Sequence, residues 1–161
     1  MARASPTDIL NYRAVDPLLS ACGQPTEEQL RAAAADGFTA IINLALHDDP
    51  RYPLPPLADE AALARSLGLL YVHIPVHFDA PTEEALCAFF DALESHRHER
   101  LLVHCAANKR VTAFLGLYRI LRLNWDPMQA FALMHEFWEP DEIWTAFIAS
   151  MLARRVGARA A

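Results

Sequence analysis

Apolar residues recur along this chain in two spacings, and each spacing predicts one kind of element. Predominantly apolar runs predict buried strands at 38–44, 69–76 and 101–104, and a weaker run predicts a short strand at 12–15. Apolar residues at helical spacing predict helices over 26–35, 59–67, 82–96, from the loop after 105 to about 123, from 127 onward, and over 141–155. Strands and helices therefore alternate over most of the sequence.

Polar and small residues mark where the helices begin and end. Thr26 begins the first helix with a glutamine three residues later, the spacing of a capping box, and Gly37 ends it. Pro127 suits the first turn of a helix that Asp126 caps. Because the segment 47–57 is rich in proline, we expect a loop there.

This alternation indicates an α/β fold with a central, mainly parallel sheet of about four to five strands, flanked by helices, and with a helical C-terminal part. In such sheets, ligands bind at the carboxyl ends of the strands. The loops after Leu44, Val76 and His104 share that edge, so we expect the functional residues there.

Composition limits the classes of protein to consider. With 161 residues, 53% hydrophobic and 21% charged, the chain fits a single domain over 1–161, with 1–7 as a flexible N-terminus. The formal charge of −6 disfavours nucleic-acid binding, and no apolar run approaches the roughly 20 residues that span a bilayer. Since Cys22, Cys87 and Cys105 form no paired or metal-binding pattern, we expect a cytoplasmic protein without metal or cofactor.

The segment 101–112 carries the strongest chemical signal. An apolar run ends in His104 and Cys105, a short polar loop with Lys109 and Arg110 follows, and a helical pattern comes next. Backbone N–H groups of such a loop and the helix N-terminus converge on one point, which favours an anion there and thiolate over thiol. Cys105 is therefore a candidate nucleophile, whereas the other two cysteines are interpreted as packing residues.

His104-Cys105, a short loop, an arginine and the hydroxyl of Thr112 resemble the signature loop of cysteine-dependent protein phosphatases, the tyrosine and dual-specificity superfamily. Over about residues 8–140 the chain is similar to a bacterial, dual-specificity-like branch, on five further segments: Asn11-Tyr12-Arg13, Gly23-Gln24-Pro25-Thr26-Glu27-Glu28-Gln29-Leu30, Ile41-Ile42-Asn43-Leu44, Tyr71-Val72-His73-Ile74-Pro75-Val76 and Pro81-Thr82. The resemblance implies that Cys105 attacks phosphorus and that Arg110 and the loop amides hold the phosphoryl oxygens.

The same resemblance assigns substrate-binding roles around the nucleophile to His104, Ala106, Ala107, Asn108, Lys109, Val111 and Thr112. Within this set, the Thr112 hydroxyl is expected to stabilise the thiolate. His104 is expected to orient the loop through a hydrogen bond. Lys109 is either a ligand of the anion or a solvated charge.

One departure from the phosphatase pattern concerns loop length. The pattern has five residues between cysteine and arginine, whereas four separate Cys105 from Arg110, and the usual mid-loop glycine is missing, with Asn108 nearest to it. Without a gap, Thr112 matches the hydroxyl position and Val111 falls where the arginine belongs. A shorter loop should either tilt Arg110 away from the phosphoryl group or tighten the amide ring around a smaller anion. Rhodanese-type sulfurtransferases have a loop of this smaller size.

A phosphatase also needs a general acid, because an alkoxide leaves poorly without a proton. Asp79 lies in the loop after the 69–76 strand, the connection that supplies the acid in the resembled superfamily. The alternative is that Asp79 caps the helix that begins near Thr82. His77 could share the proton chemistry. Asp48 and Asp49 could border the site from the proline-rich loop, although a solvated loop is the favoured interpretation.

Three functions remain open. The favoured one is a cysteine phosphatase acting on a phosphorylated small molecule or a phosphoprotein, with Cys105, Arg110 and Asp79 as catalytic residues. The second is a sulfurtransferase that carries a persulfide on Cys105. The third is a phospho-ligand binding module with weak or no turnover. All three place an anion at the same loop.

Overall fold

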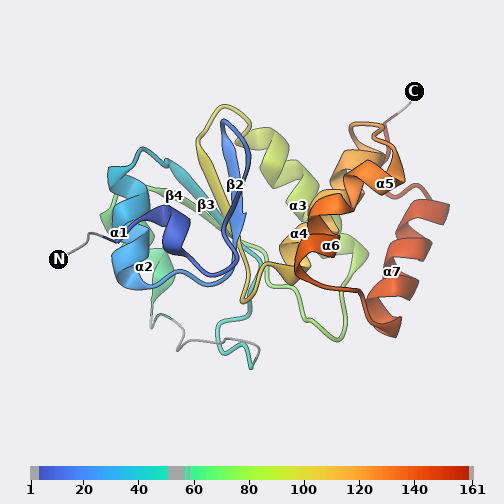
Figure 1. Ribbon diagram of the computed structural model, residues 1–161, viewed down its shortest axis with the longest axis horizontal. Coiled ribbons are helices and arrows are strands. Elements are labelled where there is room, and N and C mark those ends of the chain that lie inside the picture. Colours follow the sequence, from blue (N-terminus) through green and yellow to red (C-terminus); the bar gives the residue numbers. More distant parts are fainter. Residues whose placement is uncertain (1–3, 51–56, 58, 160–161) are drawn as a thin grey trace.

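The central sheet contains five strands in the order β1-β2-β5-β3-β4. The computed structural model describes residues 4–50, 57 and 59–159 (Figure 1). The strands are β1 (Arg13–Asp16), β2 (Leu19–Cys22), β3 (Ala40–Asn43), β4 (Leu70–His73) and β5 (Leu101–His104). β1 pairs antiparallel with β2 and all other neighbours are parallel, which confirms the expected α/β fold with a mainly parallel sheet.

Helices connect the strands and continue beyond the last one. They are the 3-10 helix η1 (Pro6–Asp8) and the α-helices α1 (Glu27–Ala35), α2 (Glu60–Ser66), α3 (Glu83–Ser95), α4 (Lys109–Leu121), α5 (Pro127–Ala130), α6 (Ala132–Phe137) and α7 (Glu142–Ala153). The expected helical C-terminal part is thus present, and it is divided into three helices. None of the described helices is long and apolar enough to cross a bilayer.

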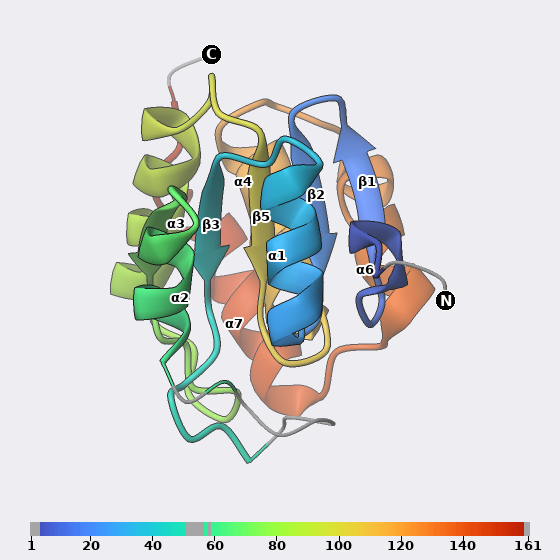
Figure 2. The ribbon, with the colours of Figure 1, turned by 90° about the vertical axis from the view of Figure 1, so that its left-hand side faces the viewer.

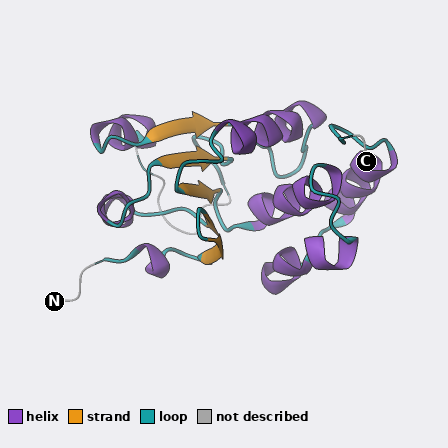
Figure 3. Cartoon of the chain, turned by 90° about the horizontal axis from the view of Figure 1, so that it is seen from above, coloured by secondary structure: helices purple, strands orange, loops and turns teal. Residues whose placement is uncertain are grey.

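The sheet separates two apolar clusters because successive strand residues point to opposite faces. Ile41 and Leu102 pack with α1 and α2 on one face, whereas Ile42 and Val103 pack with α3, α4 and α7 on the other. Figure 2 shows α1 in front of the sheet, and Figure 3 shows the strands between two groups of helices. β5 lies in the middle of the sheet, so its carboxyl end is surrounded by protein on all sides.

Most helix limits follow the local signals. Thr26 and Gln29 form the expected capping box of α1, and Gly37 takes φ +105 just after that helix. The side chain of Thr82 caps α3, and that of Asp126 caps α5 with a proline in its first turn. Of the predicted proline-rich loop, residues 51–56 lie outside the described residues.

The sequence analysis did not predict β2. Its residues, Leu19 to Cys22, contain no β-branched or aromatic side chain, so the local preference for a strand is weak. The turn before it is made by Asp16, whose carboxylate accepts two backbone N–H groups, at 2.8 and 2.9 Å. The strand forms because it pairs with β5, and this pairing places Cys22 opposite His104.

Candidate active site

The candidate nucleophile follows the last residue of the central strand. Cys105 comes directly after β5 and is 1% exposed, and α4 begins at Lys109. Between them Asn108 takes the left-handed backbone conformation, with φ +66. Asparagine adopts this region more readily than most residues, so it makes the turn for which the resembled family uses glycine.

Neighbouring segments hold the 105–110 loop from outside. The N–H of Gln24 donates to the carbonyl of Ala106 at 2.9 Å, and Asn11 Nδ2 donates to the carbonyl of Ala107 at 3.0 Å. In return, Asn108 Nδ2 donates to the carbonyl of Asn11 at 2.9 Å. These bonds engage the loop carbonyls on the outer side, away from the cysteine.

Most backbone N–H groups of the loop, in contrast to its carbonyls, have no partner among the described residues. The loop pairs with Gly23 at Ala107 in an antiparallel bridge, whereas the N–H groups of Ala106, Ala107, Lys109 and Arg110 donate no hydrogen bond to any residue that the structure describes. Two of them, at Lys109 and Arg110, belong to the first turn of α4, where N–H groups have no partner within the helix. Free amides and the positive end of a helix make this loop suitable for an anion.

Arg110 is buried, at 1% exposed, and is held from the opposite side of the site. Its Nη1 donates to Asp49 Oδ2 at 2.5 Å and to the carbonyl of Val76 at 2.8 Å. Its Nε is buried without a hydrogen-bond partner among the described residues. A buried charged group with an unused donor is costly unless a further acceptor arrives, so Arg110 is prepared for an anionic ligand.

A small cavity brings the main candidates together. Its volume is about 50 Å³, and it is lined by Phe78, Cys105, Ala106, Ala107, Lys109 and Arg110. Arg110 therefore faces the same space as the thiol, and the short loop does not tilt it away. The small volume fits the second expectation for a shortened loop, a ring tightened around a small anion.

His104 does not reach this cavity. It is fully buried, and its two ring nitrogens contact the carbonyl of Cys105 at 3.1 Å and Glu60 Oε2 at 2.6 Å. The expected role in orienting the loop agrees with this geometry, whereas a direct substrate contact does not. The substrate-binding assignment of His104 is therefore corrected to a supporting one.

The side chains of three other assigned residues are directed away from the cavity. The Val111 side chain packs in the apolar core, and the Asn108 side chain is directed to Asn11. The Thr112 hydroxyl donates to the carbonyls of Asn108 at 2.8 Å and Lys109 at 3.0 Å. In this structure its proton is therefore directed to backbone carbonyls, and the expected contact with the thiolate stays a prediction. Trp138 Nε1 donates to the Thr112 oxygen at 3.2 Å and so lies near the site.

Asp79 lies in an exposed turn beside the cavity. The turn is closed by the N–H of Ala80, which donates to the carbonyl of His77 at 3.1 Å. Phe78, the preceding residue, lines the cavity, and Asp79 itself does not. Since Thr82 caps α3, the alternative that Asp79 caps this helix is wrong. The role of Asp79 as general acid stays a prediction.

Two buried acidic residues were missed from the sequence. Asp49 was interpreted as part of a solvated loop, but it is 5% exposed and bound to Arg110. Glu60 is 8% exposed and bound to His104. Neither stands out in the sequence, because each lies far from its partner along the chain and in a segment with other polar residues.

Comparisons with known proteins agree with the family suggested by the loop. The profile of the family described as "DSP-PTPase phosphatase fused to NAD+ Kinase" matches residues 6–136. No curated protein sequence matches the chain.

Solved structures share the fold over most of the chain. A DUF442 protein from Shewanella putrefaciens CN-32, named as a candidate phosphatase, is 29% identical, with 92% of this chain and 95% of that chain covered and a TM-score of 0.78. The cysteine-to-serine variant of TpbA from P. aeruginosa, in complex with phosphotyrosine, is 21% identical, with 98% and 88% covered and a TM-score of 0.64. The catalytic domain of the PP-IP phosphatase SIW14 from S. cerevisiae, in complex with citrate, is 18% identical, with 88% and 85% covered and a TM-score of 0.65.

Proposed function

Because this chain belongs to the family of DSP-PTPase phosphatases fused to NAD+ kinase, a dual-specificity-like branch of the cysteine-dependent phosphatases, we propose that it hydrolyses phosphate monoesters with Cys105 as nucleophile. The observation that supports this most strongly is the buried Arg110, which keeps an Nε without a partner among the described residues and lines a small cavity together with Cys105. The N–H groups of Ala106, Ala107, Lys109 and Arg110, which have no partner among the described residues, add further donors for phosphoryl oxygens.

The proposed reaction has two steps. In the first, the Cys105 thiolate forms a bond to phosphorus, the bond from phosphorus to the ester oxygen breaks, and Asp79 donates a proton to that oxygen. In the second, Asp79 takes a proton from water, the water oxygen bonds to phosphorus, and the phosphorus–sulfur bond breaks. Inorganic phosphate leaves and the thiolate is restored. Arg110 and the loop amides stabilise the charge on the transferred group in both steps.

The cavity limits what part of a substrate can enter. A volume of about 50 Å³ suits a phosphoryl group, so the remainder of the substrate would lie outside, against Phe78 and Lys109 at the rim. The complex of TpbA with phosphotyrosine makes an aryl phosphate the natural first substrate to assay. Since the chain carries a net charge of −6, attraction of an anionic substrate must come from this local group of donors.

The decisive experiment compares three activities in one preparation: hydrolysis of para-nitrophenyl phosphate, transfer of sulfur from thiosulfate to cyanide, and binding of vanadate. Cys105→Ser is the control. Phosphate hydrolysis that disappears in the variant supports the proposal. Sulfur transfer without phosphate hydrolysis would replace it with the sulfurtransferase. Vanadate binding with neither activity would leave a phospho-ligand binding module.

A further inference from the structure

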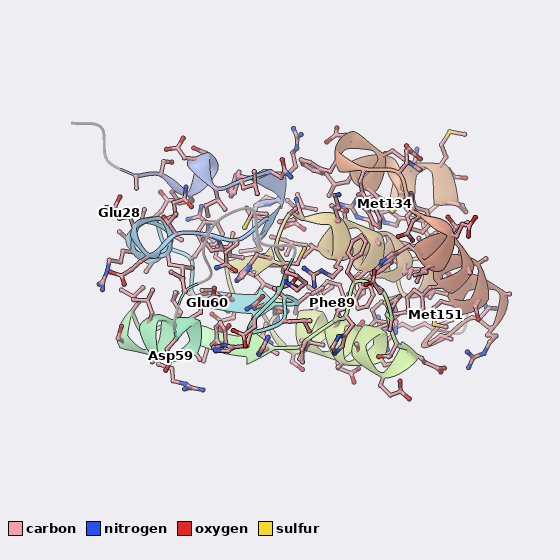
Figure 4. The ribbon with its side chains drawn as sticks, turned by 90° about the horizontal axis from the view of Figure 1, so that it is seen from below. Glu28, Asp59, Glu60, Phe89, Met134 and Met151 are labelled. Atoms are coloured by element: carbon pink, nitrogen blue, oxygen red, sulfur yellow. The ribbon has the colours of Figure 1, made fainter. Side chains whose placement is uncertain are left out.

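A buried polar cluster lies behind the candidate active site. Glu60, at the start of α2, contacts His104 through Oε2 at 2.6 Å, and the same carboxylate accepts from Gln24 Nε2 at 2.7 Å and from the Tyr71 hydroxyl at 3.2 Å. Figure 4 shows Glu60 on α2, beside the sheet. Glu60 comes from a different segment than any residue of the 105–110 loop, yet it reaches the residue next to the nucleophile.

The hydrogen bonds of His104 restrict the protonation states that His104 and Glu60 can adopt together. Both ring nitrogens face an acceptor, the carbonyl of Cys105 at Nδ1 and the Glu60 carboxylate at Nε2. A neutral imidazole can donate through only one nitrogen. Either the ring carries both protons, or Glu60 is protonated and donates to Nε2.

The surroundings of Glu60 decide between these two states. Burial acts to raise the pKa of Glu60, but the charge of His104 and the hydrogen bonds from His104, Gln24 and Tyr71 together outweigh it and lower that pKa. Glu60 is therefore ionised at neutral pH. An ionised Glu60 can only accept, so both contacts of the His104 ring are donations, from Nε2 to Glu60 and from Nδ1 to the carbonyl of the nucleophile, and this geometry gives the ring two protons.

The other charged groups near His104 and Glu60 do not take the place of the imidazolium beside Cys105. On β2, burial first, and then the charges of Cys105 and Glu60, raise the pKa of the Cys22 thiol well above its ordinary value, so Cys22 stays neutral. Across the loop, the charge of Arg110 is offset by Asp49. The far side of Glu60 borders a cavity of about 220 Å³ whose other charged or titratable lining groups are His47, Asp59, Arg65, Tyr71 and His73.

We propose that Glu60 is a positioning residue for Cys105: it keeps His104 doubly protonated and oriented, and the fixed imidazolium favours the thiolate. This inference rests on the proposed function, because a thiolate is what a phosphatase nucleophile needs. Its test does not require phosphatase activity. A cation held within the dry interior acts on a neighbouring anion far more strongly than one in solvent. Removal of the Glu60 charge would leave His104 with a single ring proton and the thiolate without that support.

The test is the pH profile of Cys105 alkylation by iodoacetamide, followed by mass mapping, for the wild type, Glu60→Gln and Glu28→Gln. We expect Glu60→Gln to move the profile to higher pH and to slow alkylation at pH 6 about tenfold, since one pH unit in thiolate formation is a factor of ten. At high pH, where the thiolate is complete in both proteins, the rates should converge. Glu28→Gln removes the same charge from an exposed position on α1, so its profile should follow the wild type.

An unchanged profile in Glu60→Gln, or an equal displacement in Glu28→Gln, would overturn the proposal. If Glu60→Gln does not fold, nitrogen NMR of the His104 ring in the wild type at pH 7 replaces it. Two N–H signals from that ring support the inference, and one overturns it. Alkylation and NMR need no phosphate substrate, so absent phosphatase activity would refute the proposed function and leave this result intact.

Discussion

Arg110 shows how one side chain can be both fixed and available. Its Nη1 is bound by Asp49 and by the carbonyl of Val76, which fixes the guanidinium, while its Nε keeps a proton that no described residue accepts. A buried ion pair adds little net stability, but the loss of one partner leaves a buried charge unpaired. Asp49 therefore serves the orientation of Arg110 more than the stability of the fold.

The first prediction follows from this pair. In Asp49→Asn, the charge that fixes Arg110 is removed, and aryl-phosphate turnover should fall by about 10²-fold, as for the loss of one well-placed donor to a transition state. The control is Asp48→Asn, which removes the same charge from the exposed neighbouring residue and should leave turnover unchanged. Steady-state kinetics of both variants measure this. Equal activities in the two variants would show that the ion pair does not position Arg110.

The second prediction concerns Asp79, which lies beside the cavity in an exposed turn. Asp79→Asn should slow the hydrolysis of alkyl phosphates by about 10²–10⁴-fold and that of activated aryl phosphates much less, because a good leaving group departs without a proton. The dependence of kcat on the pKa of the leaving group measures this. If both substrate classes slow equally, Asp79 acts on the turn and not on the leaving oxygen.

Single residues also show how far sequence reasoning reaches. Cys105, Lys109 and Arg110 were placed together correctly because they lie within one short loop, where local geometry decides. Asp49 was named only as a residue that could border the site and Glu60 was not named, because their partners lie 61 and 44 positions away. Only the packed fold brings such pairs into contact, and a single sequence carries no local sign of it.

At the scale of elements, local signals determined the helices better than the strands. The caps at Thr26, Thr82 and Asp126 lie next to the residues they bind, so they could be predicted directly. The 69–76 run, in contrast, forms a strand only over Leu70–His73, and β2 was missed. Strand limits depend on which neighbour offers hydrogen bonds, and that neighbour lies far along the chain.

The third prediction concerns Gly23, which follows β2 and packs against the active-site loop. A Cβ on Gly23 would lie 2.7 Å from the carbonyl oxygen of Ala106 and 3.1 Å from that of Leu10, and backbone atoms cannot move aside as a flexible side chain can. Gly23→Ala should therefore displace the 105–110 loop and reduce aryl-phosphate turnover by at least the roughly 10²-fold of one lost donor. The measurement is turnover per folded protein, with folding checked by circular dichroism.

The matched control for that substitution is Gly68→Ala. Gly68 takes φ +78, so an alanine there is strained and should lower the free energy of unfolding by about 1 kcal/mol, yet no atom lies within 4 Å of the added Cβ. Stability should fall while turnover is retained. If Gly68→Ala lost as much turnover as Gly23→Ala, activity would be following overall stability instead of the position of the loop.

At the scale of the whole molecule, the site owes its place to the middle of a parallel sheet. β5 has parallel neighbours on both sides, so β2 and β3 end beside it at the same edge. Segments from five separate parts of the chain reach this edge: residues 10–11, 23–24, 46–49, 76–79 and 105–110. Their convergence explains why the location of the site could be predicted from topology, while the identity of the supporting contacts could not.

The last prediction tests whether the short loop is matched to this surrounding structure. α4 is buried along most of its length and packs against α3, α5, α6 and α7, so it cannot slide to accommodate an extra residue. A glycine inserted between Asn108 and Lys109 would restore the spacing of the wider phosphatase pattern. It would also have to bulge into the cavity or separate Arg110 from Asp49. We therefore expect the insertion to lower aryl-phosphate turnover by about 10²–10³-fold.

The control is a glycine inserted between Arg97 and His98, in the exposed turn that precedes the other end of β5, which should leave turnover unchanged. Kinetics and vanadate binding of the two insertion variants provide the measurement. Increased turnover in the 108–109 variant would mean that the four-residue spacing limits the native enzyme. Decreased turnover would mean that the packed sheet and α4 already hold Arg110 where the phosphoryl group needs it, and that the loop length and the fold form one matched unit.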